Sequence, residues 1–357
     1  MKSFVFVISI AAIAGSIAAQ STPTYKVPRM ADGHPDLQGV YDIATLTPLE
    51  RPAGQKATLT KEEVKQLESA NTERRSAGDA PLSADRSAPP VGGTGRGGGG
   101  GGKVGGYNGF WLDPGTKYNM VDGQYRSSIV MDPADGHIPP MTPQGRQRLA
   151  SMRGQAATSD AAEGNDPDLD KTPGAYDDPE RRPLGERCLL GFGSTSGPPA
   201  LPDYMYNNLH QIVETSDSVM ILTEMVHDAR IVRMNAQHLP PTIRKWMGDS
   251  VGHWEGDTLV VDTTNFTNKT RFRGSTENLH VVERFTRTGP RSLLYKFTIE
   301  DPATWERPWT GEMTWPLTDQ RIFEYACHEA NNALADILSG ARARDRELAE
   351  AAAKKSK

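Results

Sequence analysis

The chain has 357 residues, a formal net charge of −5 at pH 7 and 36% hydrophobic residues. This length and composition allow one large β domain, or two domains of ordinary size, with a real core. The charge is mild and spread over both signs, which excludes a basic face for nucleic acid and an acidic tail.

The N-terminus has the organisation of a secretory signal. Met1-Lys2 supplies a positive charge, an apolar run covers residues 4–14, and small residues follow at 16–19. This pattern predicts a signal peptide at residues 1–19 and a periplasmic or secreted mature protein. A transmembrane anchor is the alternative, although the apolar run is short for one. No later stretch approaches the roughly 20 apolar residues that span a bilayer, so we expect no membrane span after cleavage.

The segment before the β region is predicted to contain one helix and one linker. Residues 20–88 read as an extended segment whose helix begins with a capping box at Thr60 and Glu63 and runs to about Ser76. Residues 89–106 are Gly-rich, which predicts a flexible linker because such a run has high backbone entropy and few side chains to bury. A phosphate-cradling loop is excluded because no Gly-Lys-Ser/Thr sequence follows.

Residues 107–330 form the predicted β domain, which is strand-dense from residue 188. Short strand-like runs alternate with tight turns, without helical crossovers, which favours an antiparallel barrel or sandwich of mainly β class. A short helix is predicted at 143–153, and residues 331–357 form a C-terminal helix expected to dock an apolar stripe on the barrel. The predicted strands cover 204–214, 218–227, 230–234, the hairpin 246–266, 279–287, 292–300 and 321–328.

The central hairpin surrounds Glu255-Gly256-Asp257, a connection short enough to reverse the chain. Because side chains alternate along a strand, Leu259, Val261 and Thr263 share one face. Val260 lies on the opposite face, so we expect that face to be partly covered as well.

Cys188 and Cys327 are the chain's two cysteines. An exported chain enters an oxidising compartment, so the sequence predicts a disulfide that ties the start of the β region to its last strand. Two independent buried thiols are the alternative.

Several sequence blocks resemble a group of mostly uncharacterised secreted bacterial proteins. The blocks are Asp32 to Tyr41, Ser127 to Pro140, the Trp-Glu-Gly-Asp-Thr-Leu-Val-Val block from Trp254 to Val261, Val282 to Phe285, and Glu324 to Glu329. The resemblance implies an exported protein but no particular activity. Gly39-Val40-Tyr41 is also similar to the Gly-x-Trp start of the first strand in lipocalin-like (calycin) barrels, with Tyr41 in place of Trp, which implies a barrel of that shape.

Glu283 is the residue that alternation places in the core. On its strand it shares a face with Leu279, Val281 and Phe285, so a buried face makes it a carboxylate inside the barrel. Such a carboxylate either transfers protons with a raised pKa or pairs with an Arg on a neighbouring strand, and the sequence leaves both open. Glu224 shares a face of its strand with Met220 and Leu222, so the same two alternatives, proton transfer or an ion pair, apply to its carboxylate.

The sequence predicts two further sets of site residues. The catalytic alternative joins Glu283 to His328 or Asp301 as an acid/base pair. The ligand-lining set combines a carboxylate with aromatic side chains: Glu224, Trp254, Tyr295, Phe297, Tyr325 and Trp309. His227, His253 and His280 lack metal-ligand spacing, so we predict no metal site and no cofactor.

The leading hypothesis is an exported β-barrel protein that binds an apolar or aromatic small molecule. The alternatives are a cofactor-independent lyase, isomerase or hydrolase that uses a pocket carboxylate and a histidine, and an interaction module of the cell envelope. The sequence predicts no nucleic-acid partner and leaves the oligomeric state open.

Overall fold

A computed structural model describes residues 25–78, 113–153, 178–182, 184–191, 197–202, 206–270, 272–329 and 331–355. The predicted signal peptide and the predicted Gly-rich linker both lie outside these ranges.

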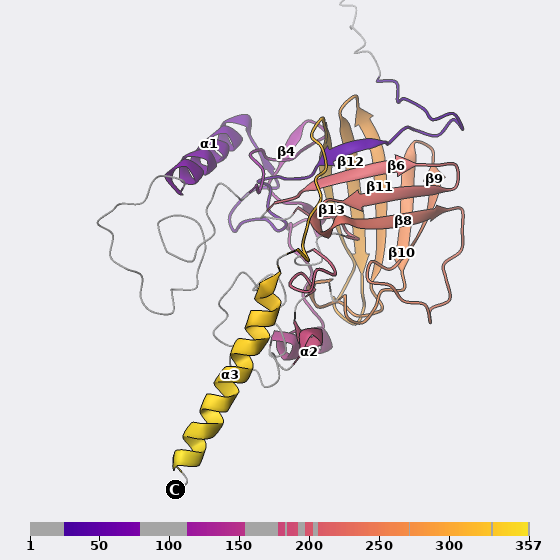
Figure 1. Cartoon of the computed structure of the whole chain (residues 1–357). Helices are drawn as coiled ribbons and strands as arrows, with labels where there is room; N and C mark the ends of the chain where they lie inside the picture. Colours follow the sequence, from indigo (N-terminus) through magenta and orange to yellow (C-terminus); the bar gives the residue numbers. More distant parts are fainter. Residues whose placement is uncertain are drawn as a thin grey trace, which may run out of the picture.

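The architecture is mainly β, as predicted, with a closed barrel at its centre. Ten described strands form one sheet in the order β1-β6-β7-β8-β9-β10-β11-β12-β13-β5, and β1 also pairs with β13. This pairing closes the first nine into a barrel, and β5 (Val130–Asp132) adds to the outside of β13. Figure 1 shows the salmon strands β6–β8 crossing in front of the orange strands that follow in sequence. The barrel strands are β1 (Gly39–Asp42), β6 (Leu209–Glu214), β7 (Ser218–Thr223), β8 (Asp228–Met234), β9 (Asp249–Glu255), β10 (Thr258–Thr264), β11 (His280–Gly289), β12 (Ser292–Glu300) and β13 (Trp309–Thr318).

β1 comes from the segment predicted to be extended. It pairs with β6 and β13, which lie far from it in the chain. A small separate sheet, β2-β4-β3, lies beside the barrel and comprises β2 (Thr58–Leu59), β3 (Met120–Val121) and β4 (Gln124–Arg126).

One strand pair departs from the predicted antiparallel pattern. β8 and β9 run parallel, with Val232 opposite Ser250. Parallel neighbours need a crossover connection, and residues 235–248 supply it outside the barrel. This pair and the count of nine strands distinguish the barrel from the eight-stranded up-and-down arrangement of lipocalins.

The predicted strand at 321–328 is wrong, because the last barrel strand is β13 and residues 321–327 are irregular. β13 contains Gly311 and Pro316, two residues that usually argue against a strand. Gly311 lies under the ring of Phe297, where a Cβ would approach the ring Cζ to 2.3 Å, so only glycine fits. β1 and β5 occupy the remaining pairing edges of β13, so no free edge is left there for a later strand.

The central hairpin is confirmed. β9 and β10 pair antiparallel with Glu255 opposite Thr258, and Gly256 in the turn has a φ of 60°. Leu259, Val261 and Thr263 face the interior and are fully buried. Val260 on the outer face is 3% exposed, so both faces of β10 are covered, as the apolar pattern indicates.

The predicted helices are present. In α1 (Lys61–Gly78) the capping box forms: the Thr60 N–H donates to Glu63 Oε2 at 2.6 Å, and the Glu63 N–H donates to Thr60 Oγ1 at 3.2 Å. α2 (Pro143–Arg153) packs near the short helix η6 (Phe272–Gly274). Two further one-turn helices in the described ranges are η3 (Pro179–Arg181) and η5 (Met225–His227).

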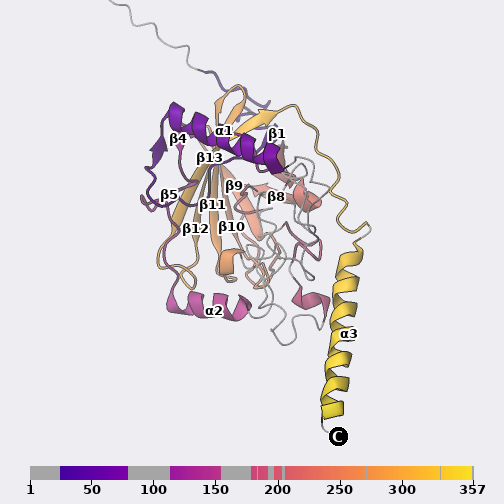
Figure 2. The ribbon, with the colours of Figure 1, turned by 90° about the vertical axis from the view of Figure 1, so that its left-hand side faces the viewer.

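The C-terminal helix α3 (Asn332–Lys355) does not dock along the barrel as predicted. In both ribbon views it runs away from the strands (Figures 1 and 2). Leu338 of its apolar stripe is buried, whereas Leu348 is 60% exposed. None of the described helices is apolar over a length that would cross a bilayer.

The predicted disulfide is confirmed. Cys188 and Cys327 are bonded, with a sequence separation of 139. Cys188 precedes β6 and Cys327 follows β13, so the bridge joins the two segments that flank the main run of strands. The corrected position of the last strand means that Cys327 lies beyond the strands.

Candidate functional site

A buried ion pair crosses the barrel interior. Arg230 on β8 shares the inward face with Val232, and Glu283 on β11 shares it with Phe285. Arg230 Nη1 lies 2.5 Å from Glu283 Oε2, and Nη2 donates to Oε1 at 2.9 Å. Their side chains are 5% and 0% exposed. Because β9 and β10 separate the two strands, the pair crosses the barrel interior instead of joining neighbouring strands.

Tyr295 extends this ion pair into a network. Its hydroxyl donates to Glu283 Oε1 at 2.8 Å and accepts from the Ala200 N–H at 2.9 Å. Burial, as the largest cause, and then the negative charge of Glu283 raise the pKa of Tyr295 well above its usual range. The phenol therefore stays protonated and remains a donor. Ala200 belongs to residues 197–202, a segment before β6 that reaches the core.

His210 on β6 is a neutral imidazole beside this network. Burial lowers its pKa to about 4, and the positive charge of Arg230 acts in the same direction. Its Nδ1 lies 3.4 Å from the carbonyl oxygen of Asn208, which can only accept. Nδ1 therefore carries the proton and Nε2 presents a lone pair.

Two polar atoms here have no hydrogen-bond partner within the described part of the chain. They are Nε2 of His210 and Nε1 of Trp315, an acceptor and a donor. The two rings are neighbours, with centroids 5.1 Å apart. Buried polar atoms are nearly always bonded, so this adjacent pair marks a point of unmet hydrogen bonding in the core.

Aromatic side chains surround the network. The Trp315 ring lies 4.6 Å from Tyr295, 5.6 Å from Phe285 and 6.3 Å from Tyr41, between ring centroids. A second group contains Phe297 and Trp309, with centroids 5.8 Å apart. The barrel interior thus combines large apolar rings with a few polar groups, a composition that small-molecule sites also have.

Residues 25–38, which we call the strap, cross the end of the barrel where β9 and β11 finish. Arg29 pairs with Asp257 in the central hairpin at 2.8 Å, and the ring of His34 stacks on Trp254 at 5.0 Å. The strap's Leu37 is fully buried. These contacts hold the strap to the rim of the barrel.

Glu214, at the end of β6, binds the strap through the backbone. Its Oε1 accepts from the Leu37 N–H at 2.8 Å. Burial, as the largest cause, raises the pKa of Glu214 to about 7; Asp36 and Asp32 add to this, while Arg287 and the Leu37 hydrogen bond oppose it. The residue is 8% exposed, so its carboxylate is poorly hydrated when charged.

A histidine and carboxylate cluster lies on the outside of the barrel. His238, in the crossover segment 235–248, places Nδ1 3.2 Å from Asp249 and Nε2 3.0 Å from Asp262. His280 Nε2 approaches the other Asp262 oxygen at 3.0 Å. Asp262 holds the pKa of His280 above its usual range, chiefly through this hydrogen bond. The cluster fixes the crossover segment to β10 and β11.

The three residues assigned to acid/base catalysis do not come together. Asp301 is 2% exposed and accepts from the Thr276 N–H at 2.6 Å and from the Thr304 hydroxyl at 2.8 Å, so it organises the loop after β12. His328 is exposed, on the irregular segment after β13. Within the described residues, no hydrogen bond or ion pair joins either of them to Glu283.

The six predicted ligand-lining residues divide into three groups: three in the barrel interior, one at its rim and two outside the interior. Tyr295, Phe297 and Trp309 are fully buried in the barrel interior. Trp254 is half-buried under the strap, at the rim.

Glu224 and Tyr325 do not line the lumen. β7 ends at Thr223, and its inward face carries Val219 and Ile221, so the face predicted for Glu224 is wrong. Glu224 is buried and accepts from the Phe323 N–H at 3.0 Å, and Tyr325 stacks on Tyr206. Both residues hold the segment after β13 against the barrel.

The predicted site residues did not include Arg230, His210 or Trp315. The alternation that identifies Glu283 also applies to Arg230, which alternates with Val232, and to His210, which alternates with Ile212. Trp315 lies on β13, which was not predicted as a strand. Alternation along the strand could have identified Arg230 and His210. Gly311 and Pro316 argue against a strand at β13, so the same argument was not applied to Trp315.

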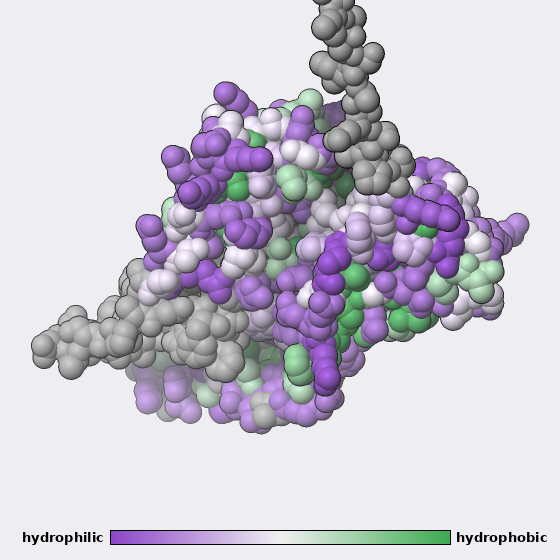
Figure 3. Space-filling view, turned by 90° about the horizontal axis from the view of Figure 1, so that it is seen from above, coloured by the Kyte–Doolittle hydropathy of each residue, from purple (hydrophilic) through white to green (hydrophobic). Residues whose placement is uncertain are grey.

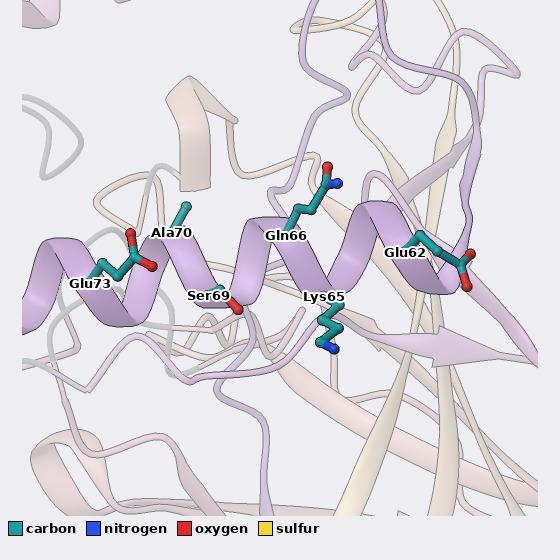
Figure 4. A pocket seen from close by; sticks show the side chains of 6 residues that line it. All are labelled: Glu62, Lys65, Gln66, Ser69, Ala70 and Glu73. Carbon is teal, nitrogen blue, oxygen red and sulfur yellow. The ribbon is translucent and has the colours of Figure 1, made fainter.

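Among the described side chains, no group of three or more His, Cys, Asp or Glu residues has an arrangement that could hold a metal ion. An open hollow of about 500 Å³ lies along α1, lined by the mostly polar side chains Glu62, Lys65, Gln66, Ser69, Ala70 and Glu73 (Figure 4). These residues form one stripe on the helix. Their mostly polar side chains differ from the aromatic side chains of the barrel interior.

Fold and site together define a closed β-barrel protein with a polar network buried among aromatic rings. Comparison of the chain with protein families, curated proteins and solved structures gives no match. The resemblance to a group of secreted bacterial proteins therefore stays a prediction.

Proposed function

We propose that this chain is an exported protein that holds an apolar or aromatic small molecule inside the barrel. The observation that carries the proposal is the composition of the barrel interior, where the polar network of Arg230, Glu283 and Tyr295 lies among fully buried rings. Such a mixture gives an apolar ligand contact area and gives its polar groups a small number of fixed partners. The strap over one rim would shield a bound molecule from water.

Export rests on the sequence of residues 1–19 and is supported by the disulfide, which persists in an oxidising compartment. Small apolar molecules dissolve poorly in water. A closed barrel that binds such a molecule in the periplasm would shield its apolar surface from water.

The test is recovery of a ligand from the exported protein. Organic extraction of protein purified from the periplasm, read by mass spectrometry, should release a small molecule that heat-unfolded and refolded protein lacks. The stripped protein should bind an uncharged naphthylamine fluorophore saturably. Recovery of no molecule, together with no saturable binding, would overturn the proposal.

Neighbouring residues of β12 provide a matched pair of variants. Phe297 faces the lumen and Lys296 faces outward. We expect Phe297→Leu to change the affinity for the fluorophore and Lys296→Met to leave it unchanged. Equal effects of the two substitutions would place binding outside the barrel.

The alternative hypothesis of an acid/base enzyme required Glu283 to lie beside His328 or Asp301, and this arrangement does not occur. Glu283 is engaged by Arg230 and Tyr295, while Asp301 and His328 lie elsewhere. An enzyme on this scaffold would therefore need a different set of residues.

An interaction module is favoured by exposed apolar side chains. Phe323, after β13, is 70% exposed, and Ile231, on the outer face of β8, is 53% exposed. On the face seen in Figure 3, however, hydrophobic residues form small separate patches on a mostly hydrophilic surface. The lumen therefore supports small-molecule binding better than the surface supports a protein partner.

A further inference from the structure

We propose that the molecule held in the barrel is uncharged and carries a hydroxyl group that lies between His210 and Trp315. The hydroxyl donates to Nε2 of His210 and accepts from the Nε1–H of Trp315. This inference rests on the proposed function and goes further, because it names the chemical class of the ligand and the two atoms that recognise it.

The two atoms are complementary in type. Trp315 Nε1 is a donor only, and His210 Nε2 presents a lone pair because Nδ1 faces the carbonyl of Asn208. Both atoms are buried and have no partner among the residues that the structure describes, and their rings are adjacent. An orphaned donor beside an orphaned acceptor is satisfied at once by a group that both donates and accepts.

A hydroxyl is the smallest organic group with this property. An ether or a carbonyl oxygen accepts from Trp315 but offers nothing to His210. The third orphaned nitrogen of the lumen, Nε1 of Trp309, lacks such a counterpart, because its ring neighbours are Phe272, Phe297 and Trp305. The polar end of the ligand therefore belongs beside Trp315.

The site favours an uncharged ligand. Arg230 and Glu283 satisfy each other through two bonds, and His210 is neutral at neutral pH. No further charge faces the two orphaned atoms from these groups, and moving an unpaired charge into such an interior is strongly unfavourable. The aromatic wall fits the rest of a ring-containing or aliphatic alcohol.

The test uses three probes of similar shape, namely benzene, anisole and phenol. Titration calorimetry on the wild-type protein, stripped of ligand, measures the affinity for each at pH 7. We expect phenol to bind roughly tenfold more tightly than anisole or benzene, because only phenol completes both hydrogen bonds. This comparison needs no variant, so it does not depend on the folding of altered proteins.

Two variants locate the preference. Trp315→Phe and His210→Phe each keep a ring and remove one of the two polar atoms, so each should reduce the phenol-to-benzene ratio severalfold. Lys296→Met is the control, since Lys296 lies on the outward face of β12, away from the two orphaned atoms, and it should leave the ratio unchanged. Circular dichroism melts confirm that each variant is folded.

The outcomes separate the two levels of the proposal. If none of the probes and no larger apolar molecule binds, small-molecule binding itself is wrong. If benzene and phenol bind equally, binding in the barrel stands and the hydroxyl inference falls, with a buried water serving both atoms instead. A phenol preference that survives in Trp315→Phe would equally overturn the assignment.

Discussion

Arg230 and Glu283 meet across the barrel interior through two hydrogen bonds, although β9 and β10 separate their strands. Each charge is buried, so each depends on the other for its stability. The pair therefore links opposite walls of the barrel, and its removal should affect the whole fold.

Glu283→Gln should lower the free energy of unfolding by about 3–5 kcal/mol, because it leaves the guanidinium of Arg230 buried without its counter-charge. Thermal and urea unfolding measure this loss. Arg284→Met is the matched control: Arg284 is the next residue on β11 but faces outward, where it pairs with the exposed Glu255. Its loss should cost about 1 kcal/mol or less. If Glu283→Gln melts like the wild type, the ion pair contributes nothing.

The double variant Arg230→Met/Glu283→Leu should recover most of the stability that Glu283→Gln loses. Apolar residues of similar volume often replace a buried ion pair at little cost, because neither charge remains to be desolvated. A double variant less stable than the single one would show that the pair has a larger stabilising role than its burial suggests.

Glu214 should make the protein less stable as the pH rises from about 4.5 to about 7. Its pKa is raised from 4.5 to about 7 in the folded protein, so within this window the folded state binds a proton that the unfolded state has lost. The free energy of unfolding therefore falls across the window, by roughly 1–3 kcal/mol, and stays level above it.

Glu214→Gln should remove this dependence. The amide oxygen can still accept from the Leu37 N–H, so the variant should match the wild type at pH 4.5 and exceed it in melting temperature at pH 8. Melting curves at a series of pH values check this. A wild-type profile that rises through this window, with no contribution from Glu214, would contradict the assignment.

Asp262→Asn should lower the pKa of His280. Asp262 raises that pKa in the folded protein, so its contribution to stability is complete below pH 6.5 and is lost as the pH rises through the folded value. His280 and Asp262 are about one-third exposed, so we expect about 1 kcal/mol or less from this pair. A histidine titration by NMR measures the shift.

Reduction of the Cys188–Cys327 bridge should lower the melting temperature. The bridge closes a loop with a sequence separation of 139, for which the chain-entropy account gives an upper limit of about 5 kcal/mol. Melts with and without reductant, compared with the Cys188→Ser/Cys327→Ser variant, test this. The double variant should be insensitive to reductant; a reductant effect that persists in it would point away from the disulfide.

Local features of the sequence predicted several elements correctly. The Thr60–Glu63 capping box and the turn at Gly256 depend on residues only a few positions apart, so the sequence alone contains their physical cause. Alternation likewise predicts that Glu283 faces the interior, because the period of two along a strand holds whichever neighbours the strand has.

Only the tertiary structure decided which residues from distant parts of the chain come into contact. The partner of Glu283 is three strands away, His210 and Trp315 come from β6 and β13, and β1 closes the barrel from the far end of the chain. Gly311 and Pro316 argue locally against a strand, yet β13 forms there because Phe297 packs over Gly311 and both edges of β13 find partners. Local propensity in a β-sheet is weak beside burial and cross-strand packing, which only the closed barrel supplies.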